Sequence, residues 1–246
     1  MTHRPDPRLA EFDAVLFDLD GVLTPTADVH MHAWQTMFDE LFADWQITPP
    51  YTDEDYYAYV DGKKRYDGVA GLLRSRDVEV HWGEPSDDPS EPTVCGIGNR
   101  KNEVFMRVLH RDGIAPYPGS LALMDALEAA LIPSAVVSSS KNAVPVLDAA
   151  GIRERFPVVV DGVVAERQHL PSKPAPDVFF EGARALGVDP ARCVVVEDAL
   201  AGVQAGAAGG FGLVIGVDRG AGRDALRAAG AELIVNDLID LVENTE

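Results

Sequence analysis

Six short apolar runs, each bounded by turn residues, constrain the fold of this chain more than any other feature. They are rich in valine, isoleucine and leucine, and they lie at 14–17, 135–137, 158–160, 194–196, 213–215 and 233–235. Strands buried on both faces of a parallel sheet have this pattern. Helical patterns lie between the later runs, at 121–131, 143–150, 176–186, 199–208 and 223–229. This alternation predicts an α/β fold, a Rossmann-like doubly wound parallel sheet.

The alternation stops after the first strand, where a long stretch has no buried-strand pattern. That stretch is rich in aromatic residues and has helical patterns at 28–45, 53–60, 69–76 and 101–111. Its segment 82–92 is rich in Pro, Asp, Glu and Ser, which predicts an exposed loop. We therefore expect a helical cap domain at 26–112, inserted into a core made of 1–25 and 113–246.

The charge of the chain limits the classes of partner. It has 21 basic and 40 acidic residues among 246, a net charge of −19, which disfavours nucleic acids and anionic membranes as partners. Its two cysteines are too few for a disulfide framework or a four-cysteine zinc site. The first residues lack an apolar signal segment, and no run has membrane-spanning length. We expect a cytoplasmic monomer that acts on a small molecule.

Two aspartates follow the first predicted strand, in the segment Asp18-Leu-Asp20-Gly21. Ligands of open parallel sheets bind outside the carboxyl ends of the strands. Two close carboxylates repel each other unless a cation compensates, and Mg²⁺ suits oxygen ligands and phosphates. One carboxylate could attack phosphorus while the other moves protons. The alternative is an ordinary Asp-rich turn; an EF-hand is excluded because its later ligands are missing at the required spacing.

Three further segments complete a resemblance to the haloacid dehalogenase (HAD) superfamily, whose first motif resembles the segment from Asp18 to Thr24. Ser138 follows the second strand, Lys173 lies in a Lys-Pro-Ala-Pro segment, and the acidic pair Glu197-Asp198 follows the fourth strand. Taken singly, these could be a helix cap, a solvated lysine and helix N-terminal acids. Four motifs in order, each near a predicted strand end, favour the family.

The resemblance implies a function for each motif residue. Asp18 would be the nucleophile and Asp20 the acid/base, and the hydroxyl of Ser138 would hold a phosphoryl oxygen. Lys173 would neutralise the aspartyl-phosphate. One Mg²⁺ would be bound by Asp18, the backbone carbonyl of Asp20 and Asp198. Glu197 would be a nearby acid in this metal group or the partner of the lysine. Because Asp20 is an acid, phosphate-ester chemistry is favoured over dehalogenation.

Residues outside the four motifs resemble the β-phosphoglucomutase subfamily. By this resemblance, the residues that bind or orient substrate and phosphate would be Thr26, His30, Trp34, Arg65, Lys101, Ser139, Ser140, Lys141 and Asn142. A mutase working through a sugar bisphosphate must hold two phosphates, and Arg65, Lys141 and Ser140 could form the second phosphate site.

These observations predict phosphoryl transfer through an aspartyl-phosphate. The expected reaction converts β-glucose 1-phosphate to glucose 6-phosphate, with glucose 1,6-bisphosphate as intermediate and activator. The alternative is a phosphatase that hydrolyses a small sugar phosphate with the same groups. A third reading, a non-catalytic phosphate-binding module, predicts the loss of motif residues, and all four motifs are present.

Overall fold

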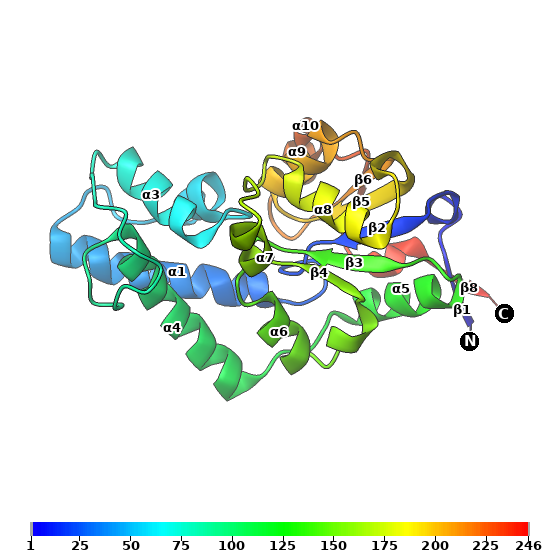
Figure 1. Cartoon of the computed structure of the whole chain (residues 1–246), viewed down its shortest axis with the longest axis horizontal. Coiled ribbons are helices and arrows are strands. Elements are labelled where there is room, and N and C mark those ends of the chain that lie inside the picture. The colour runs from blue at the N-terminus through cyan, green and yellow to red at the C-terminus, as the bar shows by residue number, and fades with distance from the viewer. Residues whose placement is uncertain (1, 246) are drawn as a thin grey trace. The chain divides into compact units, whose positions relative to one another are not determined.

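The structure is a computed structural model that describes residues 2–245, and the chain divides into two compact units. The first unit is formed by the residues up to Pro25 together with those from Ile114 onward. The second unit is Thr26–Gly113. Figure 1 shows both units, with the second coloured blue to green. Between residues 2 and 245, no helix has the length and apolarity needed to cross a membrane.

The first unit is built on a parallel sheet whose strands are the predicted apolar runs. The strands are β2 (Ala14–Phe17), β3 (Ser134–Val137), β4 (Val158–Val160), β5 (Cys193–Glu197), β6 (Leu213–Val217) and β7 (Leu233–Val235). Their order in the sheet is β4-β3-β2-β5-β6-β7, and every pairing is parallel. The predicted doubly wound α/β fold is confirmed. The strand order reverses at β2, and ligand sites of such sheets lie at that point.

Helices cover both faces of this sheet. They are α5 (Pro118–Ala129), α6 (Ala143–Ala149), α7 (Gly162–Arg167), α8 (Asp177–Leu186), α9 (Leu200–Ala208) and α10 (Arg223–Ala229). Figure 1 shows α8, α9 and α10 on one face and α5 and α6 on the other. Short 3₁₀ segments are η1 (Leu9–Glu11), η3 (Arg153–Arg155), η4 (Pro190–Arg192) and η5 (Leu238–Leu241). Gly187 caps the C-terminus of α8, and its φ of +73° suits a residue without a Cβ.

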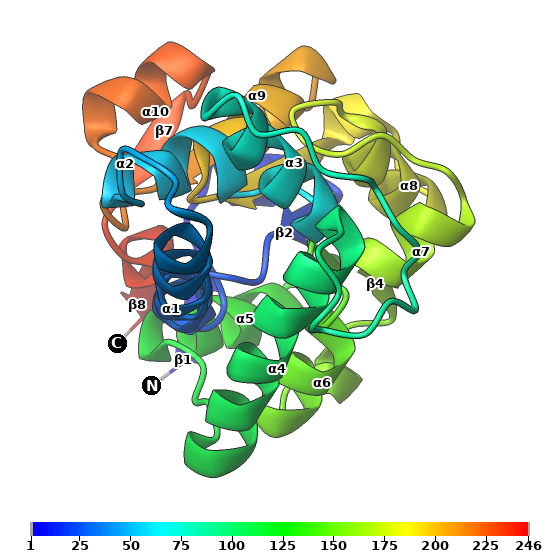
Figure 2. The same ribbon diagram turned by 90° about the vertical axis from the view of Figure 1, so that its left-hand side faces the viewer.

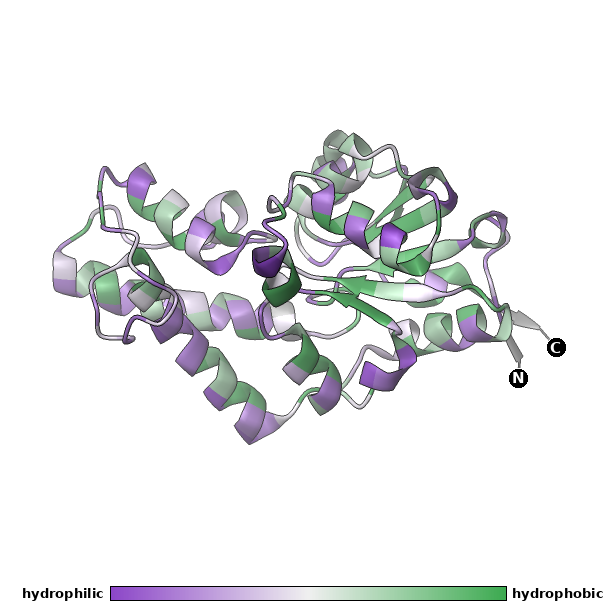
Figure 3. Ribbon diagram, in the orientation of Figure 1, coloured by the Kyte–Doolittle hydropathy of each residue, from purple (hydrophilic) through white to green (hydrophobic). Residues whose placement is uncertain are grey.

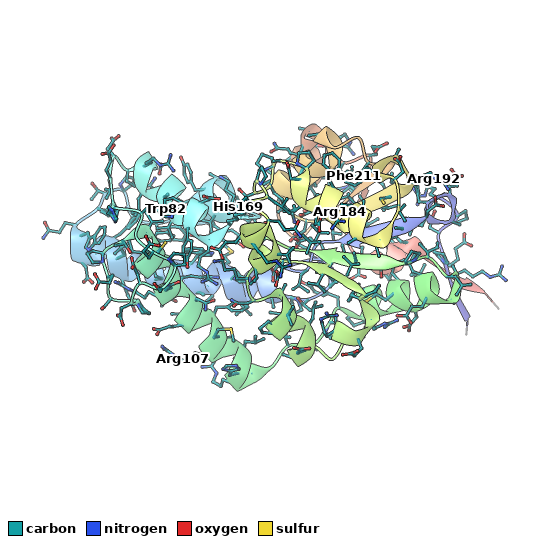
Figure 4. The ribbon with its side chains drawn as sticks, viewed as in Figure 1. Trp82, Arg107, His169, Arg184, Arg192 and Phe211 are labelled. Carbon is teal, nitrogen blue, oxygen red and sulfur yellow. The ribbon has the colours of Figure 1, made fainter. Side chains whose placement is uncertain are left out.

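Apolar side chains from the sheet and helices form a dry core. In Figure 3 the strands of the sheet are mostly green, the hydrophobic end of the scale. Phe211, labelled in Figure 4, stacks on Phe180 and meets Phe179 of α8 edge to face. Phe179 is fully buried. The apolar core therefore extends from the sheet to the face of α8 that carries Phe179.

A small second sheet, which the apolar pattern did not predict, joins the two ends of the chain. Strands β1 (Thr2–Pro5) and β8 (Val242–Thr245) pair antiparallel, with Pro5 opposite Val242. The chain enters and leaves the first unit side by side, as Figure 1 shows.

The second unit is helical. Its elements are α1 (Thr26–Trp45), α2 (Asp53–Asp55), the π-helical segment η2 (Tyr56–Val60), α3 (Arg65–Ser75) and α4 (Val94–Asp112). Helices α1 and α4 pack side by side, and α3 also contacts α4 (Figure 2). Its core combines aliphatic and aromatic side chains, and Phe38 stacks on both Trp34 and Tyr51. The segment 82–92 forms turns without a helix or strand, as predicted.

Candidate active site

Three neighbouring strands of the sheet deliver polar residues to one edge. Asp18 follows β2, Ser138 follows β3, and Glu197 is the last residue of β5. Because β3 and β5 flank β2 in a parallel sheet, their carboxyl ends meet. The arrangement expected from the motif order is therefore present around Asp18.

The turn after β2 is tight and well bonded. Gly21 has φ of +81°, a conformation that favours glycine, and its N–H donates to the Thr24 carbonyl at 2.8 Å. A Cβ at Gly21 would lie 1.9 Å from Oδ2 of Asp198. The absent side chain at Gly21 therefore gives the Asp198 carboxylate its place beside the turn that carries Asp20.

Lys173 links two of the strand ends through its ammonium group. Its Nζ donates to Asp18 Oδ1 at 2.7 Å, to Glu197 Oε1 at 2.6 Å and to the Val137 carbonyl at 3.0 Å. The side chain is only 1% exposed, and Nζ lies 4.9 Å from the ring centroid of Phe179. All three ammonium donors thus have an acceptor in a dry environment.

Burial and charge both shift the pKa values of Asp18 and Lys173. Burial raises the pKa of Asp18 well above its usual range, and the nearby carboxylates of Glu197 and Asp20 add to this against the opposing effect of Lys173. Burial by itself would lower the pKa of Lys173, but the carboxylates of Asp18 and Glu197 outweigh it, so the pKa is raised. Lys173 is therefore an ammonium at neutral pH, and a cation beside Asp18 would favour its ionised form.

Glu197 and Asp198 occupy different environments although they are adjacent. Glu197 is fully buried; its Oε1 accepts from Lys173, and its Oε2 accepts from the backbone N–H groups of Asp198 and Ala199, both at 3.1 Å. A Cβ at Gly202 would lie 1.8 Å from Glu197 Oε1, so this glycine makes room for the carboxylate against α9. Of the two roles expected for Glu197, its contacts favour the lysine partner.

Carboxylate oxygens of Asp18, Glu197 and Asp198 lie within 4.8 Å of one another. Mg²⁺ takes oxygen ligands, of which carboxylates are the usual protein source. The absence of a side chain at Gly21 leaves room for the Asp198 carboxylate in this cluster. The residues present fit a divalent cation, and the metal assignment itself remains a prediction.

The segment after β3 contains the predicted phosphate-binding residues of the first unit. Ser140 N–H donates to Ser138 Oγ at 3.0 Å, and Asn142 N–H donates to Ser140 Oγ at 3.1 Å. Lys141 Nζ contacts both carboxylate oxygens of Glu166 at 2.8 Å, and Ser139 is half-buried. These bonds fix the turn that follows Ser138.

In the second unit, a lysine lies among aromatic faces. Lys101 of α4 is 3% exposed; its Nζ contacts His30 Nδ1 and lies 5.0 Å from the ring centroids of both Trp34 and Phe105. His30 stacks on Phe105 with a centroid separation of 4.0 Å. The structure thus brings together three of the predicted residues, and Thr26 is buried at the start of α1.

Arg65 begins α3, and an asparagine of α4 orients it. Its guanidinium donates to Asn102 Oδ1 at 2.7 Å and lies 6.0 Å from the ring centroid of Tyr66. The Tyr66 hydroxyl donates to Asn99 Oδ1 at 2.9 Å. Two asparagines on one face of α4 therefore fix two neighbouring side chains of α3.

The chain matches one family model over residues 12–210, described as haloacid dehalogenase-like hydrolase. This match spans well over half of the chain. The chain belongs to this family. The resemblance found in the four motifs is thereby confirmed, and the protein is an enzyme.

Similar proteins refine the placement within the HAD family. A β-phosphoglucomutase of Mycobacterium bovis is 45% identical over 239 residues, covering 93% of this chain and 91% of the relative. Hexitol phosphatase A of Escherichia coli is 31% identical, covering 79% and 78%. The structure of a CbbY variant from Rhodobacter sphaeroides with xylulose-(1,5)bisphosphate is 26% identical, with a TM-score of 0.71 and coverage of 94% and 96%.

Two residues that contact a predicted site residue or the turn after Asp18 were not predicted from the sequence. Phe105 stacks on His30, and Arg219 donates to the Gly21 carbonyl. Phe105 lies four residues after Lys101 on α4, so helical spacing could have indicated it. Arg219 has no such signal because it lies 198 residues from Gly21.

Proposed function

We propose that this HAD-family enzyme is a magnesium-dependent β-phosphoglucomutase that transfers phosphoryl groups through Asp18. The observation that carries the proposal is the buried contact of Lys173 with Asp18 at 2.7 Å, beside a second carboxylate two residues along the chain. The 45% identity to a β-phosphoglucomutase supports this substrate class. The bisphosphate bound to the CbbY variant supports a sugar bisphosphate as ligand.

In the proposed reaction, a carboxylate oxygen of Asp18 attacks phosphorus of the bisphosphate at C1. The bond from phosphorus to the sugar oxygen breaks as the aspartyl-phosphate forms, and Asp20 gives a proton to that oxygen. Glucose 6-phosphate leaves. In the second half, Asp20 takes the proton of the 6-hydroxyl of β-glucose 1-phosphate while this oxygen attacks the aspartyl-phosphate, restoring Asp18 and the bisphosphate.

Lys173 stabilises charge in both halves. Its ammonium is held by Glu197 on one side, so it cannot move away when Asp18 is phosphorylated. A fixed cation in a dry site costs no reorganisation during the reaction. Glu197 thus acts by positioning Lys173.

Mg²⁺ would be held by Asp18 and Asp198, with the Asp20 carbonyl as a further ligand by family resemblance. When bound, it would neutralise charge on the phosphoryl oxygens and favour the ionised form of Asp18. The raised pKa of Asp18 is consistent with a site completed by a cation.

The remaining predicted residues would bind the sugar and its second phosphate. Arg65 offers a planar donor pair suited to phosphate, oriented by Asn102. Lys141 offers a cation, which Glu166 holds in place, and Ser139 and Ser140 offer hydroxyl groups. His30, Lys101 and Trp34 would contact or orient the substrate, as the subfamily resemblance implies.

A phosphatase is the second candidate, and the similarity to hexitol phosphatase A favours it. The same groups would form the aspartyl-phosphate, and water would replace the sugar hydroxyl as acceptor. Both functions share the step that phosphorylates Asp18. They differ in the acceptor of the phosphoryl group, which is a sugar hydroxyl in the mutase and water in the phosphatase.

Phosphorus NMR of the protein with Mg²⁺, β-glucose 1-phosphate and a trace of glucose 1,6-bisphosphate separates the candidates. We expect a glucose 6-phosphate signal that grows with little inorganic phosphate, and no change with Asp18→Asn. Inorganic phosphate as the main product would indicate that the enzyme is a phosphatase and not a mutase. Equal conversion by the Asp18→Asn variant would overturn both.

A further inference from the structure

Arg219 reaches from the end of β6 to the turn that follows Asp18. Its Nε donates to the Gly21 carbonyl at 2.9 Å, and its Nη1 donates to the Asn236 carbonyl at 3.1 Å. The guanidinium carbon lies 4.0 Å from the ring centroid of Tyr117, a close cation–π contact. Three different segments of the first unit therefore fix the position of this head group.

The backbone that presents Arg219 is itself held in place. The preceding Asp218 accepts, through Oδ1, from the N–H groups of Gly220 and Gly222, each at 3.1 Å. Both glycines have positive φ, 130° and 88°. These two hydrogen bonds fix the turn that carries Arg219, and no predicted metal-binding residue takes part in them.

The Gly21 carbonyl belongs to a peptide that lies next to two predicted metal-binding residues, Asp20 and Asp198. Gly21 follows Asp20 directly, and its Cα lies against the Asp198 carboxylate, since a Cβ there would be 1.9 Å from Oδ2. Rotation of the peptide after Gly21 would shift the Gly21 backbone relative to Asp198. The next two carbonyls are also held, Val22 by Ser120 Oγ at 2.7 Å and Leu23 by the Tyr117 N–H at 3.0 Å.

We infer that Arg219 is a positioning residue: through the Gly21 carbonyl it fixes the turn that sets Asp20 against Asp198. This inference rests on the proposed function for the roles of Asp20 and Asp198. Arg219 itself contacts neither carboxylate in any hydrogen bond described here, so it would act on metal binding through the backbone.

The sign of its effect on metal affinity separates positioning from simple electrostatics. Removing a cation near a Mg²⁺ site should strengthen Mg²⁺ binding if charge alone matters. Removing a positioning contact should weaken it, and such partners are typically worth about 10- to 100-fold in metal affinity. The two roles therefore predict opposite changes.

Arg223 provides a matched control. Its Nη1 donates to Asn236 Oδ1 at 3.1 Å and its Nη2 to the Ile234 carbonyl at 2.8 Å, so it is bonded to the same segment after β7 as Arg219. None of its bonds described here reaches Gly21. Arg219→Met and Arg223→Met remove the same charge, and only the first releases the turn.

The test is calorimetric titration of Mg²⁺ into the full chain, together with kcat and KM for β-glucose 1-phosphate. We expect Arg219→Met to raise the Mg²⁺ Kd by about tenfold or more and to lower kcat with little change in KM. Arg219→Lys, which keeps a donor and the charge, should recover part of the affinity. Arg223→Met should stay within about twofold of the unaltered protein.

An unchanged or lower Mg²⁺ Kd in Arg219→Met would overturn the inference, as would an equal loss in Arg223→Met. Circular dichroism shows whether Arg219→Met folds. If it does not, Tyr117→Leu, which removes the phenol ring beneath the guanidinium and keeps the N–H that holds the Leu23 carbonyl, must weaken Mg²⁺ binding in the same direction. The Kd contrast does not depend on turnover. If the unaltered protein binds Mg²⁺ but forms no phosphorylated Asp18, the proposed function fails while this contrast still stands.

Discussion

The two units hold their cations in different ways. In the first unit, Lys173 lies between two carboxylates at strand ends, and every donor of its ammonium is satisfied. In the second unit, Lys101 is nearly as buried, but its described contacts are His30 and two aromatic faces. A buried ion pair is costly to break by removing one partner. Removing the ammonium of Lys173 would therefore leave two buried carboxylates without their cation, whereas the described contacts of Lys101 are with one imidazole and two ring faces.

The largest effect should come from Asp18→Asn. The amide cannot act as the nucleophile, so turnover should fall by at least about 10⁴-fold, while Lys173 keeps its bond to Glu197 and the fold persists. Steady-state rates with circular dichroism as a folding check measure this. Turnover within tenfold of the unaltered protein would contradict the role of Asp18.

The contrast between the two lysines can be tested with the same substitution at each. Lys173→Met leaves the carboxylates of Asp18 and Glu197 buried without their cation, so the free energy of unfolding should fall by about 3 kcal/mol or more. Lys101→Met removes the contact with His30 and two cation–π contacts but keeps a chain of similar length among the rings, so the loss should be smaller, about 1 to 2 kcal/mol. Urea unfolding measures both, and equal losses would remove the distinction between the two sites.

Gly21→Ala tests the crowded turn of the first unit against an open control. Both Gly21 and Gly210 have positive φ, so alanine costs about 1 kcal/mol of backbone strain at either position. Only at Gly21 would the new Cβ meet Asp198; at Gly210 nothing lies within 4 Å. We expect Gly21→Ala to weaken Mg²⁺ binding by about tenfold and Gly210→Ala to leave it unchanged. Equal Mg²⁺ affinity in the two variants would mean that the turn tolerates the added group.

The smallest effect should come from the second unit. Asn102→Ala removes the acceptor that orients Arg65, and one hydrogen bond is worth about 1 kcal/mol, so KM for the sugar phosphate should rise about fivefold. Because this contact would serve binding in ground and transition state alike, kcat should stay constant. Asn99→Ala, which releases Tyr66 and the carbonyls of Pro85 and Asp87 but keeps the bond between Arg65 and Asn102, is the control. A change in kcat without a change in KM would place Asn102 in the chemical step.

The sheet could be predicted because each buried parallel strand is a short apolar run that can be recognised from its own residues. The expected runs 14–17, 158–160 and 233–235 match β2, β4 and β7 residue for residue. The motif residues after β2, β3 and β5 then had to converge, since the register of a parallel sheet aligns its strand ends. Strands β1 and β8 have no apolar repeat, and only their mutual pairing defines them.

The second unit was harder to predict because tertiary contacts decide its helix ends. A helix was expected from Lys101, but α4 begins at Val94 and contains Gly96 and Gly98. Glycine disfavours helices, yet a Cβ at Gly96 would lie 2.4 Å from the Glu91 carbonyl oxygen, and one at Gly98 would lie 2.7 Å from the Tyr66 ring. Close packing requires these glycines, and no local pattern reports it.

The central claim is that Asp18, held by Lys173, carries the phosphoryl group. Mass spectrometry of the protein quenched in acid during turnover with Mg²⁺ and glucose 1,6-bisphosphate tests it directly, with peptide mapping to locate the added group. We predict one phosphoryl group on Asp18 in the unaltered protein and none in Asp18→Asn. A phosphoryl group mapped to another residue, or sustained turnover with no phosphorylated Asp18 at any time of quenching, would contradict the account.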